Sequence, residues 1–172
     1  MLIYNEDDAL AQWIGRQLGG IRFSPPYCCI GVARGAELLA AVLYNNFEPP
    51  NIQITFVTTS PRWASRQVIG RILGYPFREL GCRRISAITP ARNKQARAFM
   101  LRLGFNEEGH HPDYFENDAG VSYGLLKRNA QKWLEIFDVE SAITTRSSRS
   151  LHDGEGGITG EHPERDRQLA PE

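Results

Sequence analysis

Apolar and polar positions follow two rhythms along the first 126 residues. Short apolar runs and a period of two predict strands, because successive side chains of a strand point to opposite faces. Apolar positions three and four apart predict helices, because they share one stripe. The expected strands cover residues 2–4, 27–32, 37–44, 52–58, 84–89, 105–110 and 121–126. The expected helices cover residues 8–18, 66–80 with a kink at Pro76, 94–103 and 133–137.

The order of these elements predicts the fold class. The 66–80 helix gives the chain enough length to cross over the sheet, so the strands before and after it are expected to be parallel neighbours. A hairpin signal at residues 33–36 and the other short connections favour antiparallel neighbours elsewhere. The sequence therefore predicts an α+β, three-layer domain, with a mixed, mostly antiparallel sheet and helices on both faces.

The chain is expected to divide into a domain and a tail. Residues 1–138 carry the periodic pattern, whereas residues 139–172 are mostly polar, so the tail is predicted to be disordered. The N-terminus lacks the features of a signal peptide, and no apolar run approaches the roughly 20 residues of a membrane span. Cys28, Cys29 and Cys82 are expected to be small buried residues with free thiols, which favours a cytoplasmic protein.

The net charge of zero hides a strong segregation of charge along the chain. Residues 60–105 carry ten basic residues and one acidic residue, whereas residues 1–59 have a net charge of −2 and residues 106–172 a net charge of −7. So basic a segment favours an anionic partner. A nucleotide-phosphate cofactor and a nucleic acid are both candidates, and the alternative is a set of solvated helix faces.

The segment from Asn93 to Phe105 carries the most informative motif. Ala96 follows Asn93, and Gly104 and Phe105 close the segment, which gives the pattern Asn-x-x-Ala-x(7)-Gly-Phe. With Gly81 about a dozen residues earlier, this pattern resembles the signature of the GNAT superfamily of acyl-CoA-dependent N-acyltransferases. The resemblance implies an enzyme that moves an acetyl group from acetyl-CoA to a primary amine, by direct transfer in a ternary complex.

Two further runs resemble one branch of this superfamily, the enzymes that acetylate the N-termini of ribosomal proteins. Residues 103–109 match Leu-Gly-Phe-x-x-Glu-Gly, and residues 123–128 match Tyr-Gly-Leu-Leu-x-Arg. This branch tends to have an aliphatic residue where many family members have a Tyr that protonates the departing thiolate, and Met100 stands there. The acceptor amine stays open between a protein N-terminus, a lysine and a small amine.

The resemblance places acetyl-CoA at the loop before the 66–80 helix and along the 52–58 strand. A helix N-terminus suits a phosphate because its first N–H groups have no partner within the helix. The family's Arg/Gln-x-x-Gly-x-Gly/Ala pattern lacks its glycines in this chain, although Ala64 and Ser65 are small. The basic residues of 60–105 are expected to serve the phosphates, and a backbone N–H of the strand the thioester oxygen. The expected cofactor-binding residues are Phe56, Val57, Thr58, Arg62, Trp63, Ala64, Ser65, Arg66 and Asn93, the last also as a helix N-cap.

Proton transfer has no evident carrier at the positions that the resembled family uses. Met100 has no proton to donate, and Gln53 stands where relatives often have an acid. A proton carrier is therefore expected on another element. The catalytic candidates are His110, Tyr114 and Tyr123; His111, Glu116 and the polar cluster 44–46 could also face the acceptor.

Two alternatives to an enzyme stay open. A catalytically inactive GNAT-like binding or interaction module would explain Met100, Gln53 and the missing glycines, because a fold does not guarantee its usual activity. A nucleic-acid binder is unlikely, because the arginines are spread over two helices and a strand with few aromatic residues between them. No membrane partner is predicted, and no metal site, because His152 and His162 lack ligand spacing.

Overall fold

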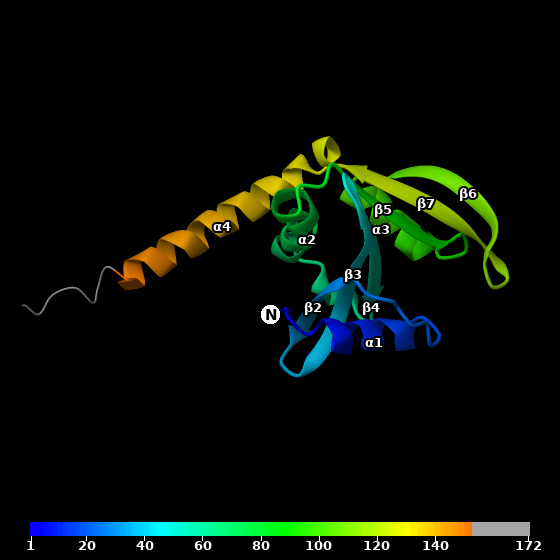
Figure 1. Cartoon of the computed structure of the whole chain (residues 1–172), viewed down its shortest axis with the longest axis horizontal. Helices are drawn as coiled ribbons and strands as arrows, with labels where there is room; N and C mark the ends of the chain where they lie inside the picture. Colours follow the sequence, from blue (N-terminus) through cyan, green and yellow to red (C-terminus); the bar gives the residue numbers. More distant parts are fainter. Residues whose placement is uncertain (153–172) are drawn as a thin grey trace, which may run out of the picture. The chain divides into compact units, whose positions relative to one another are not determined.

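The computed structural model describes residues 1–152, with side chains as far as residue 143. The described residues form strands, α-helices and three short helical turns (Figure 1). The strands are β1 (Leu2–Ile3), β2 (Cys28–Arg34), β3 (Glu37–Glu48), β4 (Asn51–Thr58), β5 (Arg84–Pro90), β6 (Asn106–Phe115) and β7 (Asp118–Leu126). The helices are α1 (Asp7–Gln17), α2 (Arg66–Gly74), α3 (Lys94–Leu103) and α4 (Gln131–His152). The short turns are η1 (Pro61–Trp63), η2 (Tyr75–Glu79) and η3 (Lys127–Asn129).

The strands form one sheet in the order β1-β2-β3-β4-β5-β7-β6. Neighbouring strands are antiparallel except β4 and β5, which are parallel. This parallel pair is the one that the crossover through α2 requires, since a strand that returns over the sheet enters it in the same direction. The predicted α+β fold with a mixed, mostly antiparallel sheet is confirmed.

Helices cover both faces of the sheet, and each face has its own core. On one face, which we call the α1 face, Leu10, Ala11 and Ile14 of α1 pack against Cys29, Ala41, Leu43 and Val57. The opposite face, the α2–α3 face, carries the larger core. There the buried side chains of α2, α3 and the first turns of α4 include Ile69, Ile72, Leu73, Met100, Leu103 and Leu134. The period-two pattern of β3 and β4 decides which side chains enter which core.

The last helix is longer than the pattern indicated. Residues 1–140 make up one compact unit, and a second unit begins at Ser141. Helix α4 runs from Gln131 to His152, whereas the sequence predicted a helix only over 133–137. It extends into the segment predicted to be disordered, and the rest of that segment, from residue 153 on, lies outside the described residues. None of the helices in the described part is long and apolar enough to cross a membrane.

The helix predicted over 66–80 changes character where the proline stands. Regular α-helix ends at Gly74, and a π-helical turn, η2, follows around Pro76. Proline has no N–H for the helical ladder, so the pattern of hydrogen bonds must change beside it. Lys127 Nζ then donates to the carbonyl oxygen of Phe77 at 2.7 Å, which ties this turn to the end of β7.

Candidate functional site

β4 and β5 pair at one end only. Residues 51–53 pair with residues 84–86, and beyond them the two strands part. β4 goes on to Thr58 paired with β3 alone, while β5 goes on to Pro90 paired with β7 alone. In Figure 1, β2–β4 and β5–β7 accordingly run in two different directions. Because N–H and C=O groups alternate in direction along a strand, about half of those in residues 54–58 point away from β3, so β4 presents a free edge.

The N-terminus of α2 follows directly after this free edge. Ser60 caps the short turn η1, and Ser65 caps α2, where its Oγ accepts a hydrogen bond from the N–H of Val68 at 3.2 Å. The N–H groups of Arg66 and Gln67 have no protein acceptor among the described residues. Two N–H groups therefore remain free at a helix end that carries a partial positive charge.

Two arginines flank these free amides. The side chains of Arg62 and Arg66 are exposed and make no ion pair in the described part of the chain, and Arg62 Nε reaches only Ser60 Oγ at 3.4 Å. No acidic residue lies in the first turn of α2. This combination of open amides and uncompensated guanidinium groups fits an anion such as a phosphate.

Three aromatic rings line the α2–α3 face where β4 parts from β5. The ring centroids of Phe56 and Trp63 are 6.2 Å apart, those of Phe56 and Phe99 6.1 Å, and those of Trp63 and Phe99 5.5 Å. Trp63 is only 5% exposed, so its ring belongs to the core, and its carbonyl oxygen accepts from the N–H of Ser65 at 2.9 Å. Phe56 is half-buried, Val57 points into the α1 face, and the Thr58 hydroxyl donates to the carbonyl oxygens of Ser60 and Leu39.

The N-terminus of α3 is capped as predicted. Asn93 Oδ1 accepts a hydrogen bond from the N–H of Ala96 at 3.0 Å. The Nδ2 group of Asn93 has no partner in the described residues and can donate to a ligand. Gly104 ends α3 with a φ of 104°, a left-handed conformation that favours glycine. Met100, at 5% exposure, lies in the core, so no proton donor stands at that position of the helix.

Half of the basic residues in the 60–105 segment are paired with carboxylates. Their partners come from the acidic part of the chain that follows, so charges far apart in the sequence meet in the fold. The pairs are Arg71–Glu140, Arg78–Asp138, Arg84–Glu108, Arg92–Asp118 and Arg97–Glu107. The expectation that the whole basic segment serves phosphates was therefore wrong for these five arginines. Arg62, Arg66, Arg83, Lys94 and Arg102 make no ion pair in the described part.

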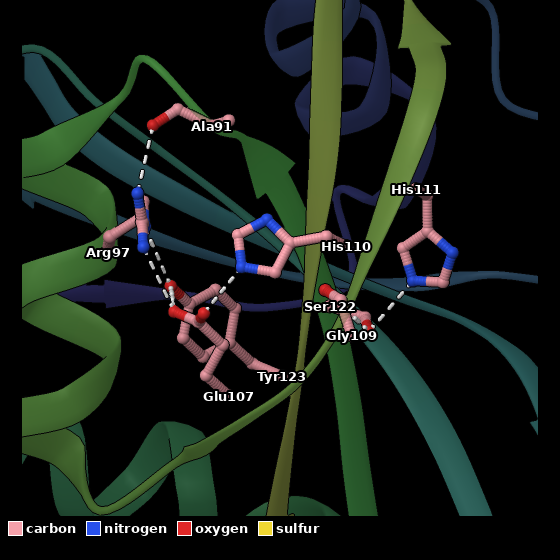
Figure 2. A network of polar contacts seen from close by, with 8 residues as sticks. All are labelled: Ala91, Arg97, Glu107, Gly109, His110, His111, Ser122 and Tyr123. Carbon is pink, nitrogen blue, oxygen red and sulfur yellow. Dashed lines mark hydrogen bonds and ion pairs between the residues drawn. The ribbon is translucent and has the colours of Figure 1, made fainter.

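Two of the catalytic candidates, Tyr123 and His110, meet in one network beside α3 (Figure 2). The Tyr123 hydroxyl donates to Glu107 Oε2 at 3.0 Å and accepts from Arg97 Nε at 3.1 Å, while His110 Nε2 lies 2.8 Å from Glu107 Oε1. The hydrogen bonds from His110, Arg97 and Tyr123 lower the pKa of Glu107, and burial is the main reason that the pKa of Tyr123 is raised.

This network faces away from the opening between β4 and β5. On α3, Arg97 and Phe99 are two positions apart, about 200° around the helix, and Phe99 is the one that contacts Phe56. The network thus ties β6, β7 and α3 together on the far side of the helix. A catalytic role for Tyr123 and His110 stays a prediction, and their position favours a structural one.

The third candidate, Tyr114, lies on the α1 face of the β6–β7 hairpin. Pairing shifts between His111 and Phe115, so residues 112–114 stand opposite the single residue 119, which is a bulge. A side chain at Gly120 would meet Tyr114 Cβ at 2.9 Å and the Ile88 Cδ1 atom of β5 at 2.8 Å. Because Gly120 has no side chain, Tyr114 can lie across β7 and reach toward β5. It is 53% exposed, and its hydroxyl has no partner among the described residues.

Polar side chains gather at the closed end of the opening. Gln53 is half-buried, and its Oε1 accepts from Asn46 Nδ2 at 2.8 Å. Asn45 pairs with Gln53 across the strands, and its Oδ1 is buried without a hydrogen-bond partner in the described part. Buried oxygens without a partner are rare in proteins, so this atom is a candidate acceptor for an N–H of a ligand or for a water molecule.

Two hollows of the surface lie beside α1 rather than at the β4–β5 opening. One, of about 470 Å³, is lined by Arg16, Arg22 and apolar residues, and the other, of about 660 Å³, by Glu6, Asp7 and Asp8. Asp7 and Asp8 already accept hydrogen bonds from the Cys29 N–H and the Tyr27 hydroxyl. We base the site on the free strand edge and the open helix end, because these present unpaired backbone groups next to each other.

The cysteines offer no ready nucleophile. Cys29 and Cys82 are buried and Cys28 is half-buried, and burial raises the pKa of each thiol, that of Cys29 to about 12. A thiol needs its thiolate form to attack, and burial disfavours that form in all three residues. No group of His, Cys, Asp or Glu side chains with the geometry of a metal site occurs in the described part.

Comparison with solved structures finds acetyltransferases. A "probable acetyltransferase" is similar with a TM-score of 0.51 and 23% identity, over 66% of this chain and 67% of that one. The dodecameric spermidine N-acetyltransferase from Vibrio cholerae is similar with a TM-score of 0.60 and 16% identity, over 78% of this chain and 95% of that one. This chain has the GNAT fold. No protein-family model and no curated protein matches the sequence.

Within the GNAT fold, the structure adds features that the sequence did not indicate. The parting of β4 and β5 and the open amides of Arg66 and Gln67 depend on backbone pairing, which no residue pattern reports. Glu107 was not a candidate and Arg97 was one only as a member of the basic segment, because their contact joins two elements. The alternation of residues along β6 could have indicated one point: His110 and His111 must lie on opposite faces.

Proposed function

We propose that the protein is a GNAT superfamily N-acyltransferase that moves an acetyl group from acetyl-CoA to a primary amine. The observation that carries the proposal is the free edge of β4, which leads directly to the open N-terminus of α2. A cofactor with an amide-bearing arm and a diphosphate matches this order: the arm would lie along the strand edge and the diphosphate at the helix end. Acetyl-CoA would supply the activated acetyl thioester, and the residues of the chain would bind and orient it.

The phosphate end is assigned to α2. The N–H groups of Arg66 and Gln67 donate to phosphate oxygens, and the guanidinium groups of Arg62 and Arg66 compensate the charge. Hydrogen bonds between ionised partners are about twice as strong as neutral ones, so a few of them suffice to hold a diphosphate. Asn93 Nδ2 is a further donor near the start of α3.

The arm and the thioester are assigned to residues 56–58 of β4. Backbone N–H and C=O groups that lack a strand partner can pair with the amides of the arm, as an added strand would. An N–H of this edge would donate to the thioester oxygen, where negative charge develops during attack. Transfer is direct, because no cysteine of the described part supplies a thiolate for a covalent intermediate.

Tyr114 is the proton donor of this proposal. Met100 cannot protonate the departing thiolate, and the hydroxyl of Tyr123 is engaged with Glu107 and Arg97. The Tyr114 hydroxyl has no partner in the described part, and Cβ and Cγ of this side chain lie beside Gly120, as does Ile88 Cδ1 of β5. Tyrosine is a suitable acid for a leaving thiolate when it can approach the sulfur.

The acceptor is a primary amine, and three classes are in question. The motifs at 103–109 and 123–128 favour the branch that acts on protein N-termini. One of the similar structures is a spermidine N-acetyltransferase, which favours a small polyamine. A lysine side chain is the third class. The buried and unpaired Oδ1 of Asn45 is a suitable acceptor for an N–H of any of them.

A catalytically inactive binding module is the second candidate. It is favoured by the burial of Met100 and by the hydrogen bond that holds Gln53 to Asn46, because neither residue can then serve as acid or base. Such a module would bind acetyl-CoA or another nucleotide through the same helix end, without turnover.

A titration separates these functions. Acetyl-CoA is added to the protein in a calorimeter and in a thermal melt, with binding expected at micromolar concentration. At about 100 times the dissociation constant the free energy of unfolding should rise by about 2.7 kcal/mol. Release of thiol is then followed with a peptide that has a free N-terminus, with Nα-acetyl-lysine and with spermidine. No binding at millimolar acetyl-CoA refutes both functions, while binding without thiol release favours the inactive module.

A further inference from the structure

Two adjacent histidines of β6 lie on opposite faces of the sheet and have different partners. His110 pairs with Val121 and points to the α2–α3 face, where Glu107 holds it. His111 pairs with Gly120 and points to the α1 face, where it contacts Ser122 (Figure 2). We infer that His111 takes the proton from the acceptor amine. This inference rests on the proposed function, since it names the base of that reaction.

The hydrogen bonds of Ser122 favour one tautomer of His111. The Ser122 hydroxyl lies 3.4 Å from the carbonyl oxygen of Gly109, and its oxygen lies 2.9 Å from His111 Nε2. When the one proton of the hydroxyl goes to Gly109, whose carbonyl oxygen can only accept, His111 Nε2–H is the donor to Ser122, and the inference takes this tautomer. The lone pair of a neutral His111 is then on Nδ1, which has no partner among the described residues. Ser122 acts as a positioning residue for the imidazole.

The ring of His111 lies on the side from which an amine can approach. Phe56, Trp63 and Phe99 close the α2–α3 face of the opening, so the acceptor enters from the α1 face. His111 Nε2 is over Ser122, which pairs with Ile88 of β5. Neighbouring strands are about 5 Å apart, so the imidazole is roughly one strand from β5 and one water molecule can bridge the gap to the amine.

An aromatic ring and paired charges surround His111 on the α1 face. Tyr114 is the nearest ring, with its centroid 6.0 Å from that of His111. The charged groups of this face include Asp118, which is paired with Arg92, and Glu108, which is paired with Arg84 over Gly124. Their opposite charges largely cancel at the distance of His111.

The proton balance of the step is complete. The amine nitrogen attacks the thioester carbon, and a carbon–nitrogen bond forms while the carbon–sulfur bond breaks. The proton lost by nitrogen passes through water to Nδ1 of His111. The sulfur leaves as a thiolate and receives a proton from Tyr114, which His111 restores through solvent. No oxidant, reductant or further reactant is needed.

The neighbouring histidine provides a matched control. His111→Gln and His110→Gln each replace an imidazole by an amide on the same strand, but on opposite faces. With whichever of the three amines the wild type acetylates, His111→Gln should lower kcat/KM by about 100-fold, a typical loss for a general base. His110→Gln should stay within about threefold, and both variants should bind acetyl-CoA like the wild type. The fall of kcat/KM toward low pH should persist in His110→Gln and change in His111→Gln.

A second measurement does not depend on acetyl-CoA. Nitrogen NMR of labelled imidazoles should find neutral His111 with its proton on Nε2, and Ser122→Ala should abolish this preference. A proton on Nδ1 in the wild type overturns the inference even if the protein is an active transferase. Equal activities and pH profiles for the two histidine variants overturn it as well. A wild type that binds no acetyl-CoA refutes the proposed function itself, and with it the assignment of His111 as the base.

Discussion

Reversing the charges of Arg62 and Arg66 should weaken acetyl-CoA binding strongly. Both side chains are exposed, neither has a carboxylate partner in the described part, and they flank the open N–H groups of α2. The double variant Arg62→Glu, Arg66→Glu therefore removes two attractive charges from the proposed phosphate site and adds two repulsive ones. It leaves the backbone amides in place, so it tests the charges alone.

The size of the effect follows from the exposure of the two residues. An exposed charge-assisted contact contributes about 1 kcal/mol, and a reversed charge about 8 Å from a phosphate in water adds about 0.5 kcal/mol of repulsion. Two sites then give about 3 kcal/mol, which raises the dissociation constant by about 150-fold. Higher salt should shrink this difference, because screening acts on exposed charges.

Calorimetric titration of acetyl-CoA at two salt concentrations measures both effects. The control is Arg34→Glu, Arg83→Glu, which changes the net charge equally at exposed arginines without ion pairs in the described part. Folding should be intact in the site variant, because an acidic residue in the first turn of a helix is favourable. A dissociation constant changed by less than about threefold, or changed equally by the control, would mean that the phosphates are bound elsewhere.

Two further predictions concern the networks beside the site. Tyr123→Phe removes the hydroxyl between Glu107 and Arg97. It should lower the free energy of unfolding by about 1–2 kcal/mol, measured as a lower Tm, and leave kcat unchanged. A fall of kcat at unchanged Tm would instead make Tyr123 catalytic. Arg84 lowers the pKa of Glu108, so the folded form keeps this carboxylate charged at a pH where the unfolded form takes up a proton. The stability that this pair contributes should be present above the ordinary carboxyl pKa, about 4.3, and should be lost as the pH falls below it. Arg84→Gln should therefore flatten the decline of Tm between about pH 5 and 3. Parallel declines of Tm in the variant and the wild type would contradict this.

Much of the fold could be predicted because local patterns and the global topology agree. The period of two in β4 and the stripe of α3 each reflect a single buried face, and the crossover through α2 requires the parallel pair. Predictions failed where pairing, not pattern, sets an end. β6 runs on to Phe115 although its residues are almost all exposed, because β7 supplies its partners. A polar strand held at an edge has no hydrophobic signal to read.

The site was harder to predict, because its properties are contacts between distant segments. Arg97 looked like one more free cation of a basic segment, yet Glu107 and Tyr123 engage it. Sequence distance hides such pairs, since the acids that compensate the 60–105 segment lie after it. What remained correct was the start of α2: the helix was expected from residue 66, and it begins at Arg66, with Ser65 as its cap. A cap is a local feature, which is why residue order alone could indicate it.

The same cap has a consequence for how this chain would hold a diphosphate. Glycines at a phosphate loop leave the backbone amides accessible, whereas the hydroxyl of Ser65 occupies the N–H of Val68 and leaves those of Arg66 and Gln67. With one amide fewer, more of the binding energy must come from Arg62 and Arg66. Amides at a helix end are fixed and shielded, while exposed guanidinium groups are mobile and screened. Binding by this chain should therefore depend more steeply on salt than binding through a glycine loop, and the missing glycines alter the balance of the site without closing it.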